Sequence, residues 1–357
     1  MLMVNWGQMK GSIFNSVGEF FALDIGSSAI RVVQLRGSQA NKTLVRYGSV
    51  PIDAQTSLSD APGDQVKVGQ LVADLVSQVG ITTTNVAVGL PSSKTFVTLV
   101  DMPKLSLQEM NSTIKYQADQ FIPMAADEAK IDWAILGDSP VGQDKVEVLL
   151  ASVTNKFSEQ RMDLLESHGF NVIALEPDSL ALARSLTPGT QSGAQMIVDM
   201  GEYATDVVIT LKGTPRLVRS IPVGGQSLVK TTMQSLTIDE NQARQLVYKF
   251  GLDQTKLEGQ IFQALQSTVD LVTTEIQKSL KFFSSRYQNV QLEGIVTSGV
   301  AAVLPGFHQY LSTAAGNVPV QTGNSWQNVS YSNDGHEQLM AVNTQFAVAV
   351  GLAERGV

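Results

Sequence analysis

The stretch that decides the fold is Phe21-Ala-Leu-Asp24-Ile-Gly26-Ser27-Ser28-Ala-Ile-Arg31-Val-Val-Gln-Leu35. Apolar residues lead to an acid, a Gly-Ser-Ser turn follows, and a second apolar run returns, which predicts a strand, a tight turn and a second strand. Asp24 is suited to holding Mg²⁺ through water, because Mg²⁺ keeps several waters and takes few carboxylates. The turn offers N–H groups and the hydroxyls of Ser27 and Ser28 to phosphate oxygens, and Gly26 lets a phosphate approach closely. The alternative is an ordinary β-hairpin with a polar tip.

A second segment repeats this pattern about half a chain later: Met196-Ile-Val-Asp199-Met-Gly201-Glu-Tyr-Ala-Thr205-Asp206-Val-Val-Ile-Thr-Leu211. Two Asp-x-Gly hairpins in two halves suggest two related domains that face one nucleotide across a cleft. A third segment, Gly294-Ile-Val-Thr-Ser298-Gly299-Val, predicts a strand whose Ser-Gly turn opens a helix. Its glycine would let the turn lie flat against a purine and ribose, since no side chain collides there.

The three segments, in this order, resemble the phosphate-one, phosphate-two and adenosine motifs of the actin, Hsp70 and sugar-kinase ATPases. The resemblance implies an α/β fold of the actin-like (ribonuclease H-like) ATPase class, with two related domains that bind ATP and Mg²⁺. It places Asp24 and Asp199 at the metal, with Asp24 also in a catalytic role. Gly26, Ser27, Ser28, Gly201, Thr205, Ser298 and Gly299 would then contact the nucleotide.

Further segments narrow the resemblance to the PilM family, the actin-like proteins of type IV pilus assembly. They run from about Phe21 to the C-terminus, nearly the whole chain: Leu90-Pro-Ser-Ser-Lys-Thr-Phe96, Met102-Pro-Lys-Leu-Ser-Leu-Gln-Glu109, Tyr116-Gln-Ala-Asp-Gln-Phe-Ile-Pro123, Ile221-Pro-Val-Gly224-Gly225, Leu280-Lys-Phe-Phe283 and Ala347-Val-Ala-Val-Gly351-Leu. The chain departs from the pattern at Arg31, where a Lys is common, at Ser298-Gly299, where Gly-Gly is usual, and at Asn324-Ser325-Trp326, where the family has Asn-Pro-Phe. Because Arg is always charged, Arg31 can still grip phosphate.

Residues 96–154 read as an inserted unit of strand, helix, strand and strand. Ser106 and Glu109 form a capping box at the start of the helix, and Pro123 follows its end. The predicted core face of that helix consists of Leu107, Met110, Ile114, Ala118 and Phe121. This order is similar to the SHS2-type subdomain that PilM shares with the division protein FtsA.

The predicted domain boundaries follow from these segments. Residues 1–19 form an N-terminal extension, 20–95 and 155–194 the first ATPase half, 195–235 and 290–357 the second half, and 236–289 a helical subdomain over the nucleotide. Helices are expected over 238–250, 260–287 and 337–354, the last packing back on the first half. The extension reads as a loosely ordered or short helical segment, as a membrane-surface contact through Trp6 and Phe14, or as a partner-binding tail.

Glu176 lies in a Glu-Pro-x-x-Ala-like segment, 175–183, similar to one in Hsp70 and FtsA. As a catalytic carboxylate it would orient water against a γ-phosphate. The alternative is that it only caps the helix opened by Pro177, where negative charge is favoured.

Two further pairs are candidate nucleotide contacts. Gly224-Gly225 follows a strand and precedes a helix, so it is either an anion-binding helix terminus or a helix start without a ligand. Glu275 and Lys278 share a helix face, and by resemblance the family uses this Glu-x-x-Arg/Lys pair at ribose hydroxyls. A surface ion pair is the alternative reading.

The composition of the chain argues against several classes of partner and binding site. The net charge of −8, from 25 basic and 33 acidic residues, argues against nucleic acid as a partner. The chain contains no cysteine, and the spacing of its three histidines does not fit metal ligands. No apolar run approaches the roughly 20 residues that a membrane span requires, so we expect no direct membrane span.

The resemblance implies a cytoplasmic assembly protein, peripheral to the inner membrane and at most a slow ATPase. It would bind the cytoplasmic N-terminal peptide of a PilN-like inner-membrane protein, with platform or motor proteins and self-association as further contacts. A small-molecule kinase of the same superfamily would need a general base near an acceptor pocket, and the inserted unit offers no polar cluster for one. An FtsA-like filament-forming protein is disfavoured, because FtsA-type chains end in an amphipathic membrane helix whereas this sequence ends Gly351-Leu-Ala-Glu-Arg-Gly-Val357.

Overall fold

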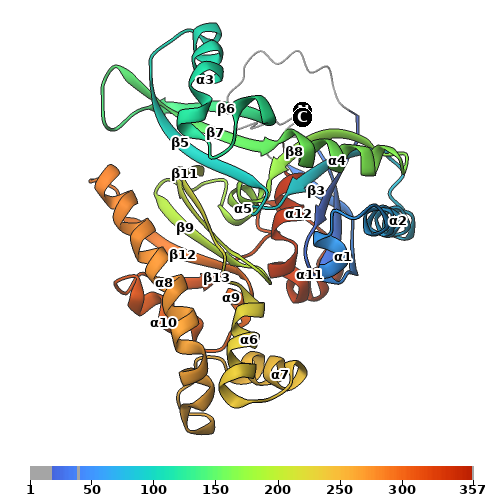
Figure 1. Cartoon of the computed structure of the whole chain (residues 1–357), viewed down its shortest axis with the longest axis vertical. Coiled ribbons are helices and arrows are strands. Elements are labelled where there is room, and N and C mark those ends of the chain that lie inside the picture. Colours follow the sequence, from blue (N-terminus) through green and yellow to red (C-terminus); the bar gives the residue numbers. More distant parts are fainter. Residues whose placement is uncertain (1–17, 38–40, 356–357) are drawn as a thin grey trace. The chain divides into compact units, whose positions relative to one another are not determined.

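The computed structural model describes residues 18–37 and 41–355, so the predicted N-terminal extension lies almost entirely outside the described residues. The chain folds into two compact units (Figure 1). Unit 1 comprises Met1–Ser185, Ser325–Ala341 and Phe346–Val357, and unit 2 comprises Leu186–Asn324 and Val342–Gln345. Residues 325–341 and 346–357 therefore cluster with unit 1, whereas the predicted second half includes them.

Unit 1 is built on a six-stranded sheet with the order β14-β3-β2-β1-β4-β8. Its strands are β1 (Phe21–Ile25), β2 (Ala29–Arg36), β3 (Lys42–Pro51), β4 (Asn85–Leu90), β8 (Asn171–Pro177) and β14 (Val329–Ser330). Its helices are α1 (Ala54–Leu58), α2 (Pro62–Val79), α4 (Asn155–Glu166), α5 (Asp178–Leu186), η3 (Asn333–Gly335), α11 (His336–Val342) and α12 (Ala347–Ala353).

Helices cover both faces of this sheet. All five residues of β1 are buried although their side chains alternate between the faces, so neither face at β1 is open to water. The helix α12 packs across β1, β2 and β4, while α2 packs against β3, β2 and α4. This confirms the prediction that the C-terminal helical segment packs back on the first half.

The inserted unit is a second, three-stranded sheet within unit 1, with the order β5-β7-β6. It contains β5 (Thr95–Pro103), α3 (Leu107–Phe121), η1 (Ala126–Glu128), β6 (Ala129–Asp138) and β7 (Lys145–Thr154). Met110 and Ile114 of α3 pack on Met102, Val148 and Leu150 of the sheet. The strands β5 and β6 are the two edges of this sheet, and both edges bear on where a peptide can add.

The predicted capping box starts α3. The Ser106 hydroxyl accepts from the Glu109 N–H at 3.3 Å, and the Ser106 N–H donates to the Glu109 carboxylate at 2.9 Å. Met110, Ile114 and Ala118 are buried as predicted. The placement of Leu107 in the core face is wrong, because Leu107 is 61% exposed. Leu107 is the first residue of the helix, and burial begins three residues later, at Met110.

Unit 2 is built on a five-stranded sheet with the order β11-β10-β9-β12-β13. Its strands are β9 (Ala194–Met200), β10 (Thr205–Leu211), β11 (Thr214–Ile221), β12 (Leu292–Gly299) and β13 (Val320–Thr322). Its helices are α6 (Gly225–Leu236), α7 (Glu240–Phe250), η2 (Leu257–Gly259), α8 (Gln260–Arg286), α9 (Val300–Val303), α10 (Phe307–Ala314) and η4 (Asn343–Gln345). The two predicted helices over 238–250 and 260–287 are confirmed as α7 and α8.

The prediction of one continuous helix over 337–354 is wrong. The chain leaves α11 for the short turn η4 and then starts α12. The Asn343 amide donates to the Gly323 carbonyl at 2.6 Å, and the Thr344 carbonyl accepts from the Ser298 hydroxyl at 3.0 Å. These bonds hold Val342–Gln345 in unit 2, while α11 and α12 pack in unit 1. A straight helix cannot serve both units.

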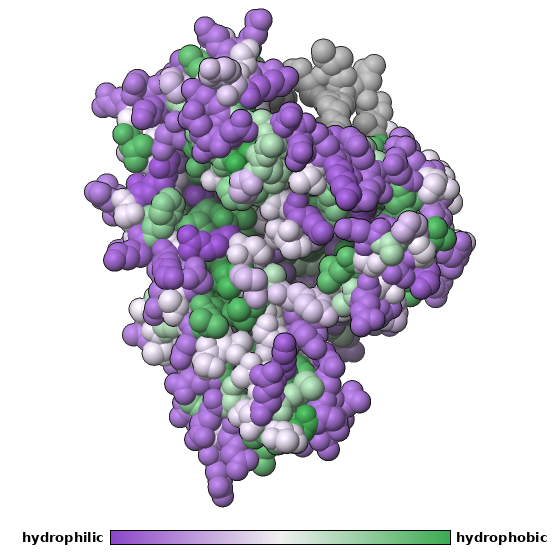
Figure 2. Space-filling view, viewed as in Figure 1, coloured by the Kyte–Doolittle hydropathy of each residue, from purple (hydrophilic) through white to green (hydrophobic). Residues whose placement is uncertain are grey.

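Hydrophilic side chains cover most of the face shown in Figure 2, and hydrophobic residues appear there in small, separate groups. In unit 2 the apolar side chains gather in a core between the sheet and helices that include α6, α7 and α8. Within residues 18–37 and 41–355, no helix is both long and apolar enough to cross a membrane.

Gly351 lets α12 approach α5, and its replacement should destabilise unit 1. A Cβ at Gly351 would collide with the carbonyl of Ala181 on α5, and backbone cannot move aside cheaply. We expect Gly351→Ala to lower the free energy of unfolding by about 1 to 3 kcal/mol or more, measured by urea denaturation. In the control Gly63→Ala, no atom lies within 4 Å of the added methyl group on α2, so this variant should match or exceed the parent by up to about 1 kcal/mol. Equal stability of the two variants would contradict the tight contact.

Candidate functional site

The first hairpin closes as the sequence predicts, between β1 and β2. Asp24 is the cross-strand partner of Arg31, whose guanidinium NH1 lies 3.2 Å from the Asp24 Oδ2. Both side chains are largely buried. Burial raises the pKa of Asp24, and the neighbouring Arg31 acts in the opposite direction. The hairpin thus holds one buried carboxylate together with its own cation.

Gly26 sits at the tight point of this turn. Its N–H donates to the Ala29 carbonyl at 3.1 Å, and its carbonyl accepts from the Ser57 hydroxyl of α1 at 2.7 Å. A Cβ there would lie 3.0 Å from the Ala29 oxygen and 3.1 Å from the Arg31 NH1. Ser27 is half-buried and Ser28 is exposed, so the two predicted phosphate-contacting hydroxyls lie at the open tip.

The second hairpin, between β9 and β10 of unit 2, repeats this construction. The Gly201 N–H donates to the Ala204 carbonyl at 2.8 Å, which matches the bond from Gly26 to Ala29 in the first hairpin. The cross-strand partner of Asp199 is Asp206, where the first hairpin has an arginine. The buried Thr205 hydroxyl donates to the Val223 carbonyl at 2.7 Å, so in this structure it ties the hairpin to the segment before α6.

Gly224 and Gly225 lie directly against this second turn. The Gly225 N–H donates to the Gly201 carbonyl at 3.0 Å, and the Gln226 N–H donates to the Glu202 carbonyl at 2.8 Å. A Cβ at Gly224 would lie 2.6 Å from the Gly201 oxygen. The glycine pair therefore joins the start of α6 to the hairpin, and two N–H groups at this helix terminus serve that contact.

The third motif runs beside the second hairpin. β12 is parallel to β9, and Ser298 and Gly299 are the register partners of Asp199 and Met200. Gly299 has a φ of +60°, and a Cβ there would collide with the Met200 carbonyl. The fold therefore brings predicted site residues from three distant segments to one end of the unit 2 sheet: Asp199, Gly201, Thr205, Gly224, Gly225, Ser298 and Gly299.

Glu275 and Lys278 form the predicted pair on α8. The Lys278 ammonium lies 2.6 Å from the Glu275 Oε1, and the Arg219 NH1 of β11 lies 3.2 Å from its Oε2. The hydrogen bond from Lys278 is the main cause that lowers the pKa of Glu275. All three side chains are a third exposed or more, so the pair is also an ion pair at the surface of unit 2. Its contact with ribose stays a prediction.

Glu176 lies at the carboxyl end of β8, at a level of the sheet close to that of Asp24. Leu23 pairs with Val88, and the next residue of β4, Gly89, pairs with Glu176. Two strand spacings therefore separate Asp24 from Glu176, about 10 Å. The carboxyl ends of parallel strands are where open α/β sheets bind ligands.

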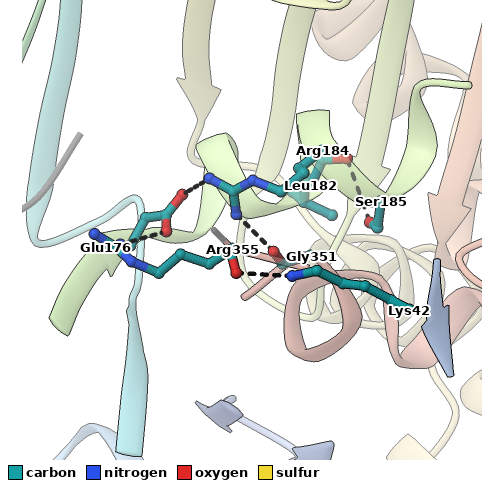
Figure 3. Close-up of polar contacts among 7 residues, drawn as sticks. All are labelled: Lys42, Glu176, Leu182, Arg184, Ser185, Gly351 and Arg355. Carbon is teal, nitrogen blue, oxygen red and sulfur yellow. Dashed lines mark hydrogen bonds and ion pairs between the residues drawn. The ribbon is translucent and has the colours of Figure 1, made fainter. Parts of the chain in front are cut away.

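Two arginines form ion pairs with the carboxylate of Glu176 (Figure 3). Arg184 NH2 lies 2.5 Å from its Oε1 and Arg355 NH1 lies 2.8 Å from its Oε2, and the Glu176 side chain is 1% exposed. Both oxygens of Glu176 therefore accept from arginines, and its role as a cap of the following helix stays a prediction. Its role in orienting water stays a prediction.

Sequence reasoning missed the arginines and the lysine around Glu176. The Lys42 ammonium donates to the carbonyls of Arg355 at 2.8 Å and Ala353 at 3.2 Å, and Arg184 NH1 donates to the Gly351 carbonyl at 2.6 Å (Figure 3). Arg184 is one residue among several on α5, and Arg355 lies 179 positions from Glu176. No local pattern links such distant positions.

Burial shifts the protonation of two groups beside this cluster. It raises the pKa of Glu354 to about 7, opposed by Arg184, a hydrogen bond from Asn328, and Lys42. It lowers the pKa of Lys42 to about 8, with repulsion from Arg184 in the same direction and attraction to Glu354 against it. In the described part of the chain, no three acidic or histidine side chains gather as ligands for a metal ion.

Comparison with known families gives one match over most of the chain. The family described as "Type IV pilus assembly protein PilM" matches residues 22–357.

Solved structures share the fold. A chain of the "PilM-PilN type IV pilus biogenesis complex" superposes with a TM-score of 0.81 at 23% identity, covering 95% of this chain and 99% of that one. The ethanolamine utilization protein EutJ from Carboxydothermus hydrogenoformans gives a TM-score of 0.51 at 16% identity, covering 96% and 91%. MreB 5 of Spiroplasma citri bound to AMPPNP gives 0.51 at 12% identity, covering 94% and 95%. The predicted α/β actin-like ATPase fold is therefore confirmed.

The buried carboxylate of Glu354 should make stability depend on pH. Its folded-state pKa of about 7 lies above the ordinary value of 4.5, so the folded chain keeps a proton that the unfolded chain releases between these values. Stability therefore falls as pH rises from about 4.5 to 7. Relative to Glu354→Gln, the parent should lose about 1 to 3 kcal/mol across this window, measured by urea denaturation at each pH. Glu337→Gln changes an exposed glutamate of α11 and should keep the parental profile; a parental profile in Glu354→Gln would refute the assignment.

Proposed function

This chain belongs to the PilM family of type IV pilus assembly proteins, and on that premise we propose that it is a nucleotide-dependent assembly scaffold. It binds Mg·ATP and the cytoplasmic N-terminal tail of a PilN-like inner-membrane protein, and nucleotide state changes its affinity for that tail. Its place is the cytoplasmic side of the inner membrane, where the partner holds it.

The observation that carries the nucleotide proposal is the repeated hairpin. Each unit contains an aspartate at a strand end, followed by a glycine turn closed by the same backbone bond, from Gly26 to Ala29 and from Gly201 to Ala204. One such hairpin is an ordinary structure, but the same construction in both units supports a phosphate-binding role for each hairpin. MreB 5, which shares the fold, is described as bound to AMPPNP.

The residues present fit Mg·ATP. In unit 1, Asp24 would hold the metal ion through water, and Ser27, Ser28 and Arg31 would meet phosphate oxygens. In unit 2, Asp199 would face the metal, and Gly201 would let the phosphate chain approach. Bound Mg²⁺ would neutralise phosphate charge, and the protein would supply positioning. Arg31 would have to share Asp24 between itself and the hydrated ion.

The nucleoside would lie in unit 2. The flat turn at Ser298-Gly299 offers a surface without a side chain, and Gly224-Gly225 borders the same end of β9 and β12. Glu275 and Lys278 already hold each other on an exposed part of α8, so ribose hydroxyls can replace water around them.

The tail of the PilN-like protein would add to the inserted unit. β5 is an edge strand, and an extended peptide can continue such a sheet through backbone hydrogen bonds. Tyr116 of α3 is 89% exposed, Leu107 is 61% exposed, and Gln120 is also exposed, which gives the peptide an apolar and a polar contact. The similar structure described as a PilM-PilN complex supports this choice of partner.

A cavity of about 360 Å³ on the other side of α3 offers a second location for the same peptide. It lies between α3 and the opposite edge strand, β6, with Lys115, Asp127 and Trp133 in its wall. The binding measurements below separate the two edges.

The nucleotide proposal predicts that either hairpin aspartate is required. Asp24→Ala and Asp199→Ala should each lower Mg·ATP affinity at least tenfold, because each removes a carboxylate from the metal. In the parent, a hundredfold excess of Mg·ATP over Kd should add about 2.7 kcal/mol of stability, read as a thermal shift. Asp74→Ala removes an exposed carboxylate of α2 and should leave the parental shift intact. Parental binding by folded Asp24→Ala and Asp199→Ala proteins would rule out the site.

The partner proposal predicts that Tyr116→Ser weakens binding of a fluorescent PilN-like tail peptide. Trp133→Ala tests the second location, the cavity at β6. The loss should be about fivefold to fiftyfold for the correct edge, since an exposed aromatic anchor typically contributes about 1 to 2 kcal/mol. The matched control is Leu271→Ser, which removes an apolar side chain of α8 that is 60% exposed. Mg·ATP should change the parental peptide affinity by about 5- to 150-fold. If the peptide binds the Tyr116 variant as it binds the parent, Tyr116 is excluded as the anchor; an affinity unaffected by Mg·ATP excludes the coupling.

A further inference from the structure

The chain passes between unit 1 and unit 2 four times, at 185/186, 324/325, 341/342 and 345/346. A bonded set of side chains fastens the unit 1 ends of these crossings to one another. The Ser185 hydroxyl donates to the Ala347 carbonyl at 2.7 Å, which joins the first crossing to the fourth. The Gln327 amide donates to the Ser185 carbonyl at 2.8 Å, which joins the second crossing to the first.

The remaining crossing is joined in the same way. The Trp326 indole N–H donates to the Leu339 carbonyl at 3.1 Å, which joins the second crossing to the third. The Asn328 amide also donates to the Arg184 carbonyl at 3.2 Å. All these bonds lie within unit 1, and Trp326 and Ser185 are buried.

Glu176, buried at the carboxyl end of β8, anchors this set within unit 1. Arg184, beside the first crossing, binds Glu176 and the Gly351 carbonyl with different nitrogens of one guanidinium (Figure 3). Arg355 binds the other oxygen of Glu176 and so fixes the segment that follows α12. The Lys42 ammonium holds the same part of the chain, because it donates to the carbonyls of Ala353 and Arg355. Breaking one partner of a buried ion pair leaves an uncompensated charge, so this arrangement resists bending.

We propose that Glu176, Arg184 and Arg355 form the fixed base of the hinge between the units, so that Glu176 is a positioning residue. The base keeps the four crossings together, and the backbone rotation that accompanies Mg·ATP binding falls on the residues just beyond it in unit 2. Hinge motions are absorbed by a few residues at the ends of elements. This inference rests on the proposed function only for what drives the motion.

The first test measures the base without nucleotide. Hydrogen exchange in the full chain should rise at least tenfold over 325–328 and 346–350 in Arg355→Met, and remain parental over α2. The matched control is Arg36→Met, which removes an arginine from an exposed ion pair with Glu19 that shares no residue with the bonded set. Parental exchange at all crossings in Arg355→Met would overturn the proposal. Glu176→Gln should act in the same direction, and Arg355→Met carries the test if Glu176→Gln does not fold.

The second test measures the motion. The chain has no cysteine, so Lys67→Cys in unit 1 and Lys281→Cys in unit 2 allow two dyes to be attached for energy transfer. Mg·ATP should change the energy transfer in the parent and in Arg36→Met. At saturating nucleotide this change should be at least twofold smaller in Arg355→Met. The Kd of Arg355→Met for Mg·ATP should stay within about threefold of the parental value. An undiminished change in Arg355→Met would overturn the coupling to nucleotide. If the parent binds no Mg·ATP, the nucleotide proposal fails, while the exchange measurement still decides the hinge base.

A third readout separates positioning from chemistry. If Glu176 orients water, Glu176→Gln should abolish ATP turnover while exchange at the crossings stays parental, and that result would overturn the proposal. If Glu176 positions the hinge base, exchange rises in both Glu176→Gln and Arg355→Met, and turnover changes alike in the two.

Discussion

A carboxylate buried away from water is stable only when cations are paired with it, and in unit 1 Glu176 is such a carboxylate. Its side chain is 1% exposed, and an unpaired charge in such surroundings would be strongly destabilising. Arg184 and Arg355 satisfy it from positions at the end of α5 and at the end of the described chain. The same guanidinium of Arg184 caps the Gly351 carbonyl, so a local electrostatic requirement fixes the geometry of a whole C-terminal segment.

Unit 2 depends on a steric constraint more than on charge. Backbone atoms approach closely at two positions where a side chain would collide: β12 meets β9 at Gly299 against Met200, and the start of α6 meets the turn after β9 at Gly224 against Gly201. These close approaches leave a surface of peptide groups at one end of the sheet, bordered by Asp199. The close approaches explain why the chain carries glycine at positions 224 and 299.

Much of this could be predicted because it is local. The hairpin at Gly26, the capping box of Ser106 and Glu109, and the long helix α8 each follow from residues within a few positions of one another. The bond from Arg355 to Glu176 could not be predicted, because it joins residues 179 positions apart and depends on how α12 packs. The break in the helix at Asn343 could not be predicted for the same reason, because the Asn343 amide donates to a carbonyl 20 residues away. Leu107 fitted the helical periodicity, but periodicity does not say at which residue of the helix burial begins.

The packing of α12 on β1, β2 and β4 has a consequence for biosynthesis. During translation the strands of unit 1 emerge early, but the helix that covers one face of them is encoded at residues 347–353, after the whole of Leu186–Asn324. Residues 186–324 of unit 2 can therefore fold on the ribosome while the sheet of unit 1 still exposes apolar side chains. Contacts of such long sequence separation slow folding and prolong the exposure of aggregation-prone surface. A nascent or truncated chain that lacks the last turns of α12 is thus a natural client of chaperones.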